Sequence, residues 1–240
     1  MCFRLVIISL VTITVAQADI VFSTLTGSTG NGGFDVCGSA PAPGNTPPVP
    51  CSQALAERFT SGADFILTDA EVIVGNQTGT SPLFNVWLAQ DSGGTPGSFI
   101  EQIGFDVSYS GTDVIATGGT GGEVTANSIA TPILLHSGTA YWLVLTPSQP
   151  DTIVYWDAGS PPYPFACSSC VAITHTTDGT GGWTTYAHTY VGQMQIDGTP
   201  FVAEVVPTPE PGFSGTFVVS ILGLLIVQRS FRSRCNANNL

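Results

Sequence analysis

Between residues 19 and 206, no apolar pattern with the 3.6-residue period of a helix persists for more than about two turns. Apolar residues occur instead in short runs rich in Val, Ile and Thr, and turn-forming residues interrupt these runs about every ten positions. Phe84, Val86 and Leu88 alternate with their neighbours at the period of two that is typical of a half-buried strand. The segment is long enough for one domain with a substantial core. We therefore predict an all-β fold, an antiparallel β-sandwich of the jelly-roll-like kind.

Strands are predicted wherever such an apolar run lies between turn signals. These runs lie at 20–25, 54–59, 65–74, 84–89, 99–103, 105–109, 132–135, 141–145, 152–156, 171–174 and 190–196. A dense turn is predicted at 91–97, where Gly, Ser and Pro accumulate. The Gly- and Pro-rich stretch at 27–50 is predicted to be an extended loop held by cysteines.

The first 18 residues have the parts of a secretory signal peptide. Arg4 is the lone positive charge, the run from Leu5 to Val15 is apolar, and Ala16-Gln17-Ala18 is a small-x-small cleavage site. We expect the secretion translocon and signal peptidase to process residues 1–18. The domain at 19–206 would then follow as the exported part.

The C-terminal segment combines an uncharged apolar stretch with a cluster of arginines. Residues 212–228 carry no charge, and their apolar side chains surround the whole helix, which predicts a single short transmembrane helix. Arg229, Arg232 and Arg234 follow at once. Because positive charge favours the cytoplasmic side, residues 236–240 are expected inside and the domain outside. A plain single-pass anchor is one interpretation of this tail.

A second interpretation depends on the order of the parts between residues 207 and 235. Pro209, Glu210 and Pro211 precede the apolar helix, and the arginine cluster comes last. This order resembles the PEP-CTERM sorting signal of Gram-negative bacteria. The resemblance implies recognition by an exosortase while the precursor is in the inner membrane, and then release or re-attachment at the cell surface or in the extracellular matrix. The two prolines favour an extended strand, which a protease can bind.

The domain itself carries a further resemblance between residues 56 and 157. The matching stretches read AERFTSG at 56–62, VWLAQDSGGTPG at 86–97 and LLHSGTAYWLVL at 134–145. They are similar to the choice-of-anchor domains of bacterial surface proteins, and most closely to the type designated R. The resemblance implies a β-sandwich displayed at the surface, and it supplies no catalytic residues. It does not extend to the cysteine-bearing segment at 37–51.

Charge excludes several classes of partner. Residues 19–210 contain 17 acidic residues and a single arginine, Arg58, and the chain contains no lysine. A domain with this balance repels phosphate groups, so neither nucleic acid nor an anionic lipid surface is an expected partner.

Four cysteines lie in the exported part: Cys37, Cys51, Cys167 and Cys170. An even number in an oxidising compartment predicts two disulfides, for which three pairings exist. The most local pairing, Cys37 with Cys51 and Cys167 with Cys170, is favoured. A redox role for the Cys-Ser-Ser-Cys sequence is disfavoured because a strand-like run follows it where a helix N-terminus would be needed.

No catalytic pattern stands out, so we do not expect an enzyme. His136, His175 and His188 lie in turn-rich contexts, and no Gly-x-Ser-x-Gly sequence occurs. No metal site is predicted from ligand spacing, and the one cofactor left open is calcium bound in loops. The loops considered are 91–94, the neighbourhood of Asp113, and 177–182.

Aromatic side chains leave a second function open. Trp87, Trp142, Trp156 and Trp183 are candidates for stacking on sugar rings, although tryptophans in a β-sandwich also serve as core residues. Two functions are therefore compared below. One is an exported structural protein of the extracellular matrix, and the other is a carbohydrate-binding, lectin-like module of an exopolysaccharide layer.

Overall fold

The structure is a computed structural model that describes residues 18–25, 33–41, 51–76, 80–109, 122–127, 129–157, 171–186 and 192–202. The chain divides into two units, Met1–Phe201 and Val202–Leu240, and nearly all described residues belong to the first. Within the described ranges every regular element is a β-strand. Among these residues no helix is long and apolar enough to span a membrane. The signal peptide up to residue 17 and the sorting tail lie outside the described residues.

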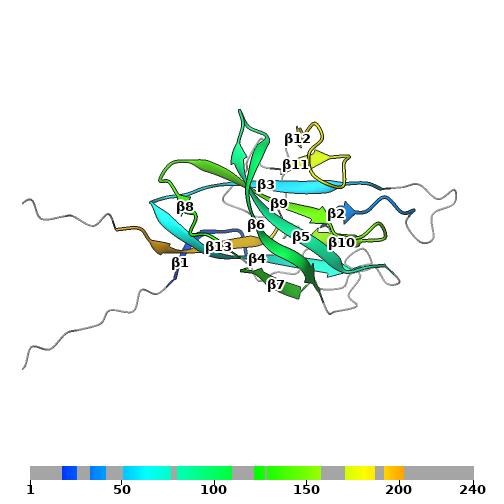
Figure 1. Cartoon of the computed structure of the whole chain (residues 1–240), viewed down its shortest axis with the longest axis horizontal. Coiled ribbons are helices and arrows are strands. Elements are labelled where there is room, and N and C mark those ends of the chain that lie inside the picture. Colours follow the sequence, from blue (N-terminus) through cyan, green and yellow to red (C-terminus); the bar gives the residue numbers. More distant parts are fainter. Residues whose placement is uncertain are drawn as a thin grey trace, which may run out of the picture. The chain divides into compact units, whose positions relative to one another are not determined.

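The first sheet is built around the long strand β4 (Phe65–Asn76), which four other strands contact directly (Figure 1). All of its strand pairs are antiparallel. Its main path runs β1 (Asp19–Ser23), β13 (Met194–Pro200), β4, β10 (Ile153–Asp157) and β2 (Gly33–Cys37), and β7 (Gly122–Ala126) and β8 (Leu134–Leu135) also pair with β4.

The second sheet is a path of six antiparallel strands in which β9 is central. In Figure 1, β3 and β11 of this sheet lie in the upper part, whereas β4 and β13 of the first sheet lie in the lower part. The order is β12 (Thr184–Tyr186), β11 (Val171–Thr174), β3 (Ala54–Thr60), β9 (Ala140–Pro147), β5 (Leu83–Asp91) and β6 (Pro96–Ser108).

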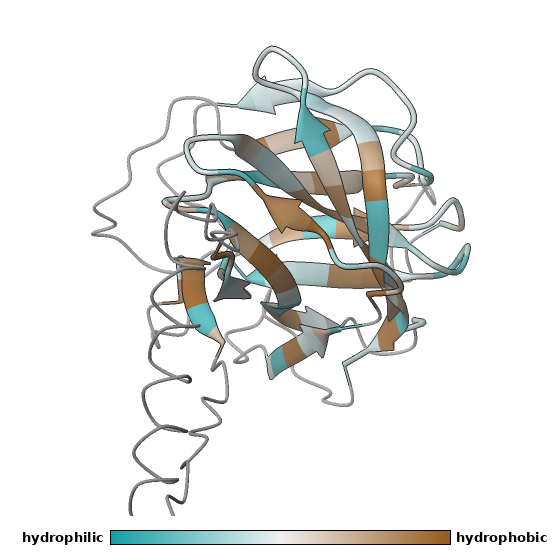
Figure 2. Ribbon diagram, turned by 60° about the vertical axis from the view of Figure 1, so that its left-hand side comes forward, coloured by the Kyte–Doolittle hydropathy of each residue, from teal (hydrophilic) through white to brown (hydrophobic). Residues whose placement is uncertain are grey.

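One hydrophobic core joins the two sheets. Val72 and Val74 of β4 are fully buried in the same cluster as Phe84, Val86 and Leu88 of β5. Brown and teal or pale residues alternate along the strands in Figure 2, as expected when one face of each strand is buried against the other sheet. The predicted all-β, antiparallel architecture and the inward-facing residues of β5 are therefore confirmed.

The face of the second sheet that points away from the first sheet is also buried. The alternation of apolar residues along 84–89 predicts only one buried face, so this second buried face was not expected. Strand register aligns Ala172, Ala56, Val144 and Trp87 in one row across four strands. Together with Trp142 and Ala89 of the next row, these residues form a second cluster, onto which Phe99 and Trp183 pack. As a result β9 is buried on both faces over nearly its whole length.

Cys37 and Cys51 form a disulfide, as predicted. It joins the end of β2 to the residues that precede β3, and the main chains of Cys37 and Gln53 exchange two hydrogen bonds of 2.8 and 2.9 Å beside it. Cys167 and Cys170 lie outside the described residues.

Several predicted boundaries are wrong for identifiable reasons. Residues 33–37, for which the Gly- and Pro-rich composition predicts a loop, form β2, because their main chain pairs with β10 opposite Trp156 and its neighbours. The two strands predicted at 99–109 are one strand, β6, whose pairing with β5 is irregular. Asp106 has a φ of 47° there, and the side chain of Asn85 accepts a hydrogen bond from its N–H. Strands β7 and β12 were not predicted at all.

Candidate functional site

The four tryptophans considered for sugar stacking have different surroundings. Trp142 and Trp156 are fully buried, so neither can stack on a sugar at the surface. Trp156 lies in the core between the sheets, where its Nε1 donates a hydrogen bond to the carbonyl of Gln193 at 3.1 Å. Trp87 is partly buried, and its Nε1 donates to the Thr146 hydroxyl at 3.1 Å. Trp183 alone among the four lines a described cavity.

Trp87 and Trp183 are connected through a residue that the sequence did not single out. Phe99 of β6 stacks on Trp87, with ring centroids 5.0 Å apart and an angle of 17° between the planes. Gly179 packs closely against both Phe99 and Trp183, since a Cβ at Gly179 would lie 2.9 Å from the Phe99 ring and 3.6 Å from Trp183. Aromatic rings in contact at this spacing stabilise each other and hold each other in place. The result is a fixed aromatic layer on the outer face of the second sheet.

The loop before β12 places Trp183 against this layer. Gly179 has a φ of 71°, a conformation that favours glycine, and the Asp178 carboxylate accepts two hydrogen bonds from Thr180, one from its N–H at 3.0 Å and one from its hydroxyl at 2.8 Å. These hydrogen bonds lower the pKa of Asp178. The Thr176 hydroxyl accepts a further hydrogen bond from the N–H of Gly181 at 2.9 Å. The loop is thus held by its own side chains.

Asp91, at the end of β5, connects three groups around the turn between β5 and β6. Its Oδ1 accepts a hydrogen bond from Nε1 of Trp142 at 2.8 Å and forms an ion pair with Nε of Arg58 at 3.0 Å. Its Oδ2 accepts a hydrogen bond from the N–H of Gly94 at 3.2 Å, which closes the turn between β5 and β6. Both carboxylate oxygens of Asp91 therefore have partners. Arg58, the one arginine or lysine of the domain, is one of these partners.

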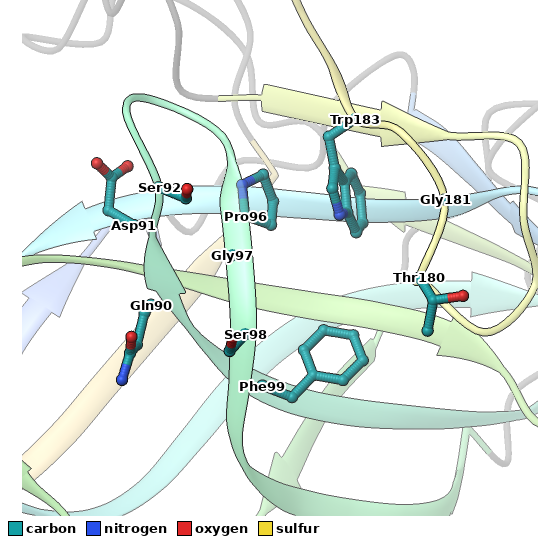
Figure 3. A pocket seen from close by; sticks show the side chains of 11 residues that line it. Gln90, Asp91, Ser92, Pro96, Gly97, Ser98, Phe99, Thr180, Gly181 and Trp183 are labelled. Carbon is teal, nitrogen blue, oxygen red and sulfur yellow. The ribbon is translucent and has the colours of Figure 1, made fainter.

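A cavity of about 500 Å³ lies between this turn and the Trp183 loop. In Figure 3, Phe99, Thr180 and Trp183 lie on one side of the β5–β6 hairpin, and Gln90 and Asp91 lie on the other. The hydroxyl-bearing residues that line the cavity, Ser92, Ser98 and Thr180, are exposed. The volume falls within the range of small-molecule sites, and the lining combines aromatic surface with several polar groups.

A second cavity, of about 810 Å³, shares Gln90 and Asp91 with the first. Its other polar lining residues include Arg58, Glu101 and His136. His136 is held by its main chain, whose N–H donates to the Tyr141 hydroxyl at 2.9 Å, while its ring lies 3.9 Å from the Asp64 carboxylate. These residues come from strands of the second sheet and the loop after β8.

Comparison with known proteins finds nothing similar. No protein family, curated protein or solved structure matches the chain.

The loops considered for calcium use their carboxylates internally. Asp91 and Asp178 both accept hydrogen bonds from their own turns, and Asp113 lies outside the described residues. Three other carboxylates, which the sequence analysis missed, have oxygens within 4.8 Å of one another on the first sheet: Asp69, Glu71 and Asp197. Asp69 and Asp197 are directly opposite in the β4–β13 register.

The pKa values of Glu71 and Asp197 are raised, in both cases mainly by burial. Burial, followed by the charges of Glu123, Asp197 and Asp69, raises the pKa of Glu71, and burial is also the largest cause that raises the pKa of Asp197. The three groups are close enough to share a cation, because hard divalent cations bind several carboxylate oxygens at once. Like charges on facing residues also destabilise a sheet, so the cluster alone does not indicate a ligand.

Two further acidic residues are buried, Glu57 on β3 and Asp157 on β10. Glu57 is 2% exposed, and its side chain accepts a hydrogen bond from the N–H of Gly192, while burial raises the pKa of its carboxyl well above the usual value. Asp157 is 1% exposed and accepts a hydrogen bond from the Gln193 amide at 3.0 Å. Both acids therefore hold the short segment that leads into β13. Neither lines the two cavities described above.

The remaining predicted residues are placed as follows. His175 is exposed, and His188 lies outside the described residues. Pro209, Glu210, Pro211 and the three arginines of the tail also lie outside them. What the structure brings together is thus an aromatic and hydroxyl-rich site at the β5–β6 turn. Trp183 was predicted there as a stacking residue, whereas the loops 91–94 and 177–182 were considered only for calcium.

Proposed function

We propose that this chain is an exported, non-enzymatic protein of the bacterial cell surface whose jelly-roll-like β-sandwich binds carbohydrate. The signal peptide at 1–18, the tail at 207–235 and the acidic composition support export and sorting by an exosortase. The polysaccharide-rich layer outside the cell is the setting in which both signals would place the domain.

The observation that carries the binding proposal is the cavity beside Phe99 and Trp183. Sugar rings present C–H groups on their faces, which pack against aromatic rings, and hydroxyls at their edges, which need hydrogen-bonding partners. The cavity offers both kinds of surface, since Ser92, Ser98 and Thr180 stand around the aromatic residues. Its aromatic layer is held in place by packing and by the loop, so little ordering is required on binding.

Removing the Trp183 side chain tests this proposal directly. In pull-downs of the full-length chain on extracellular polysaccharide, wild type should bind saturably, and Trp183→Ala should weaken binding by about tenfold or more, because the stacking surface is lost. Tyr186→Ala is the matched control, since Tyr186 is an exposed aromatic three residues away that lines neither cavity. Tyr186→Ala should bind like wild type. Absence of saturable binding by the wild-type chain would contradict the carbohydrate proposal and leave a structural role in the matrix.

The sorting part of the proposal has its own variant. Replacing Arg229, Arg232 and Arg234 with glutamine removes the positive charge that orients and retains the helix before processing. Cell fractionation should then show unprocessed precursor accumulating or lost from the membrane, and less protein at the surface. Unchanged processing of the glutamine variant would contradict a role for the arginines in sorting.

A further inference from the structure

The two cavities adjoin each other at the end of β5, where they share two lining residues. Gln90 and Asp91 line both, and Figure 3 shows these two residues across the hairpin from Phe99 and Trp183. We infer that the ligand is a neutral, linear oligosaccharide that passes the Gln90–Asp91 wall and occupies both cavities. This inference rests on the carbohydrate binding proposed above and goes further, because it specifies the charge and the length of the ligand.

The electrostatics of the first cavity favour a neutral ligand. Asp91 is its one charged lining residue, and the Asp91 carboxylate is already engaged by Arg58, by Nε1 of Trp142 and by the N–H of Gly94. An incoming anion would find no free cation there, and an incoming cation would compete with Arg58 for the carboxylate. Neutral hydroxyl and amide groups account for the other polar side chains that line it.

The second cavity disfavours anions more strongly. Glu101 adds a carboxylate to the lining of this cavity. Arg58 is the one arginine or lysine that lines it, and Arg58 is paired with Asp91. The exported part of the chain has no other basic residue outside histidine from which a positive site could be built. A polysaccharide of uronic acids would therefore be repelled, whereas carboxylates accept hydrogen bonds from neutral sugar hydroxyls.

The volumes favour more than one sugar unit. Each cavity, at about 500 and about 810 Å³, falls within the ~300 to 1,000 Å³ that holds a whole small-molecule ligand. Phe99 and Trp183 supply stacking surface in the first cavity, and Glu101 and His136 supply hydrogen-bonding groups in the second. A ligand that fills both must be extended, and the second group of contacts is formed only by chains long enough to pass the wall.

An array of oligosaccharides, probed with the full-length chain, tests charge and length together. The array carries neutral hexose oligosaccharides of two to six units in several linkages and uronic-acid oligosaccharides of the same lengths. At least one neutral series should bind, with affinity rising about tenfold or more from the disaccharide to the hexasaccharide. Uronic-acid hexamers should bind at least about tenfold more weakly than the best neutral hexamer.

Two variants assign the length dependence to the two cavities. Glu101→Ala should lower hexasaccharide affinity about three- to tenfold and leave disaccharide affinity unchanged, because Glu101 lines only the second cavity. Trp183→Ala should weaken both. The inference is overturned if the disaccharide already binds with full affinity, if Glu101→Ala has no effect on the hexasaccharide, or if uronic-acid oligosaccharides bind best. In those cases glycan binding as such can still stand, whereas failure of every glycan would remove both proposals.

Discussion

Glu57→Gln is expected to stabilise the folded protein near pH 7 and to remove most of the loss of stability between pH 4 and pH 7. Glu57 lies on β3 between Val171 and Leu143 in the strand register, and it faces the other sheet. Leaving a charged carboxylate in such surroundings costs more than one hydrogen bond from the N–H of Gly192 returns. Glutamine has the same shape, can accept the same hydrogen bond and carries no charge.

The sign of the effect follows from the direction of the pKa shift. Burial raises the pKa of Glu57 well above the model-compound value of 4.5, so the folded protein keeps the proton at pH values where the unfolded chain has released it. The free energy of unfolding is therefore highest below the unfolded pKa and falls as pH rises towards the folded pKa. Above the folded pKa the loss is complete and stays constant. Glutamine does not titrate and has no such loss.

Urea denaturation of the full-length wild type and of Glu57→Gln at several pH values measures how the free energy of unfolding depends on pH in each. Near pH 4 the two should be similarly stable, and near pH 7 the glutamine variant should be more stable by on the order of 1 to 3 kcal/mol. A weaker slope of the same sign should remain, because burial also raises the pKa of Glu71 and Asp197. Asp151→Asn, at an exposed turn position, is the control and should leave the pH profile unchanged. A Glu57→Gln variant that is less stable near pH 7, with the wild-type slope, would show that the buried group is ionised and stabilising.

Removing the Cys37–Cys51 disulfide is expected to lower the free energy of unfolding by about 3 kcal/mol. The disulfide restricts the unfolded chain by closing the segment between residues 37 and 51, and its removal returns this loop-closure entropy to the unfolded chain. For a domain of this size such a loss lowers the Tm by about 6 to 12 °C.

Thermal unfolding of Cys37→Ala/Cys51→Ala, with and without reductant, checks this value. Reductant should bring the wild type close to the double variant. A further fall in the Tm of the double variant when reductant is added would show that Cys167 and Cys170 also form a stabilising disulfide, as the sequence predicts. A double variant with the wild-type Tm would contradict the stabilising role assigned to the Cys37–Cys51 disulfide.

Local sequence patterns predicted the strands whose own residues define them. Val171–Thr174 is predicted with its observed bounds, and Ala54–Thr60 and Ala140–Pro147 differ from prediction by a few residues at the ends. Gly33–Cys37 was missed because a short Gly-initiated segment has no pattern of its own, and only its pairing with β10 makes it a strand. The same holds for the short strand Thr184–Tyr186, which is held by β11.

The site was less predictable because it depends on register. Arg58, Trp142 and Ala89 become neighbours through the pairing of three strands, and this brings Trp142 and Arg58 within reach of the Asp91 carboxylate. Phe99 could not be distinguished from a core residue by its sequence context. Trp183 was predicted as an aromatic candidate, but its position opposite the β5–β6 turn depends on the loop around Gly179. Aromatic content therefore indicated a class of function, and strand pairing decided which residues could perform it.

Delivery to the cell surface is the claim on which the carbohydrate proposals depend, because the cavities meet extracellular polysaccharide only if the chain is exported and its tail is processed. Intact-mass spectrometry of the protein recovered from the surface of its native host tests this claim most directly. We predict a polypeptide that begins at Asp19 and ends close to Pro209–Pro211, without the apolar segment and the three arginines. A surface protein whose sequence continues to Leu240 would contradict it.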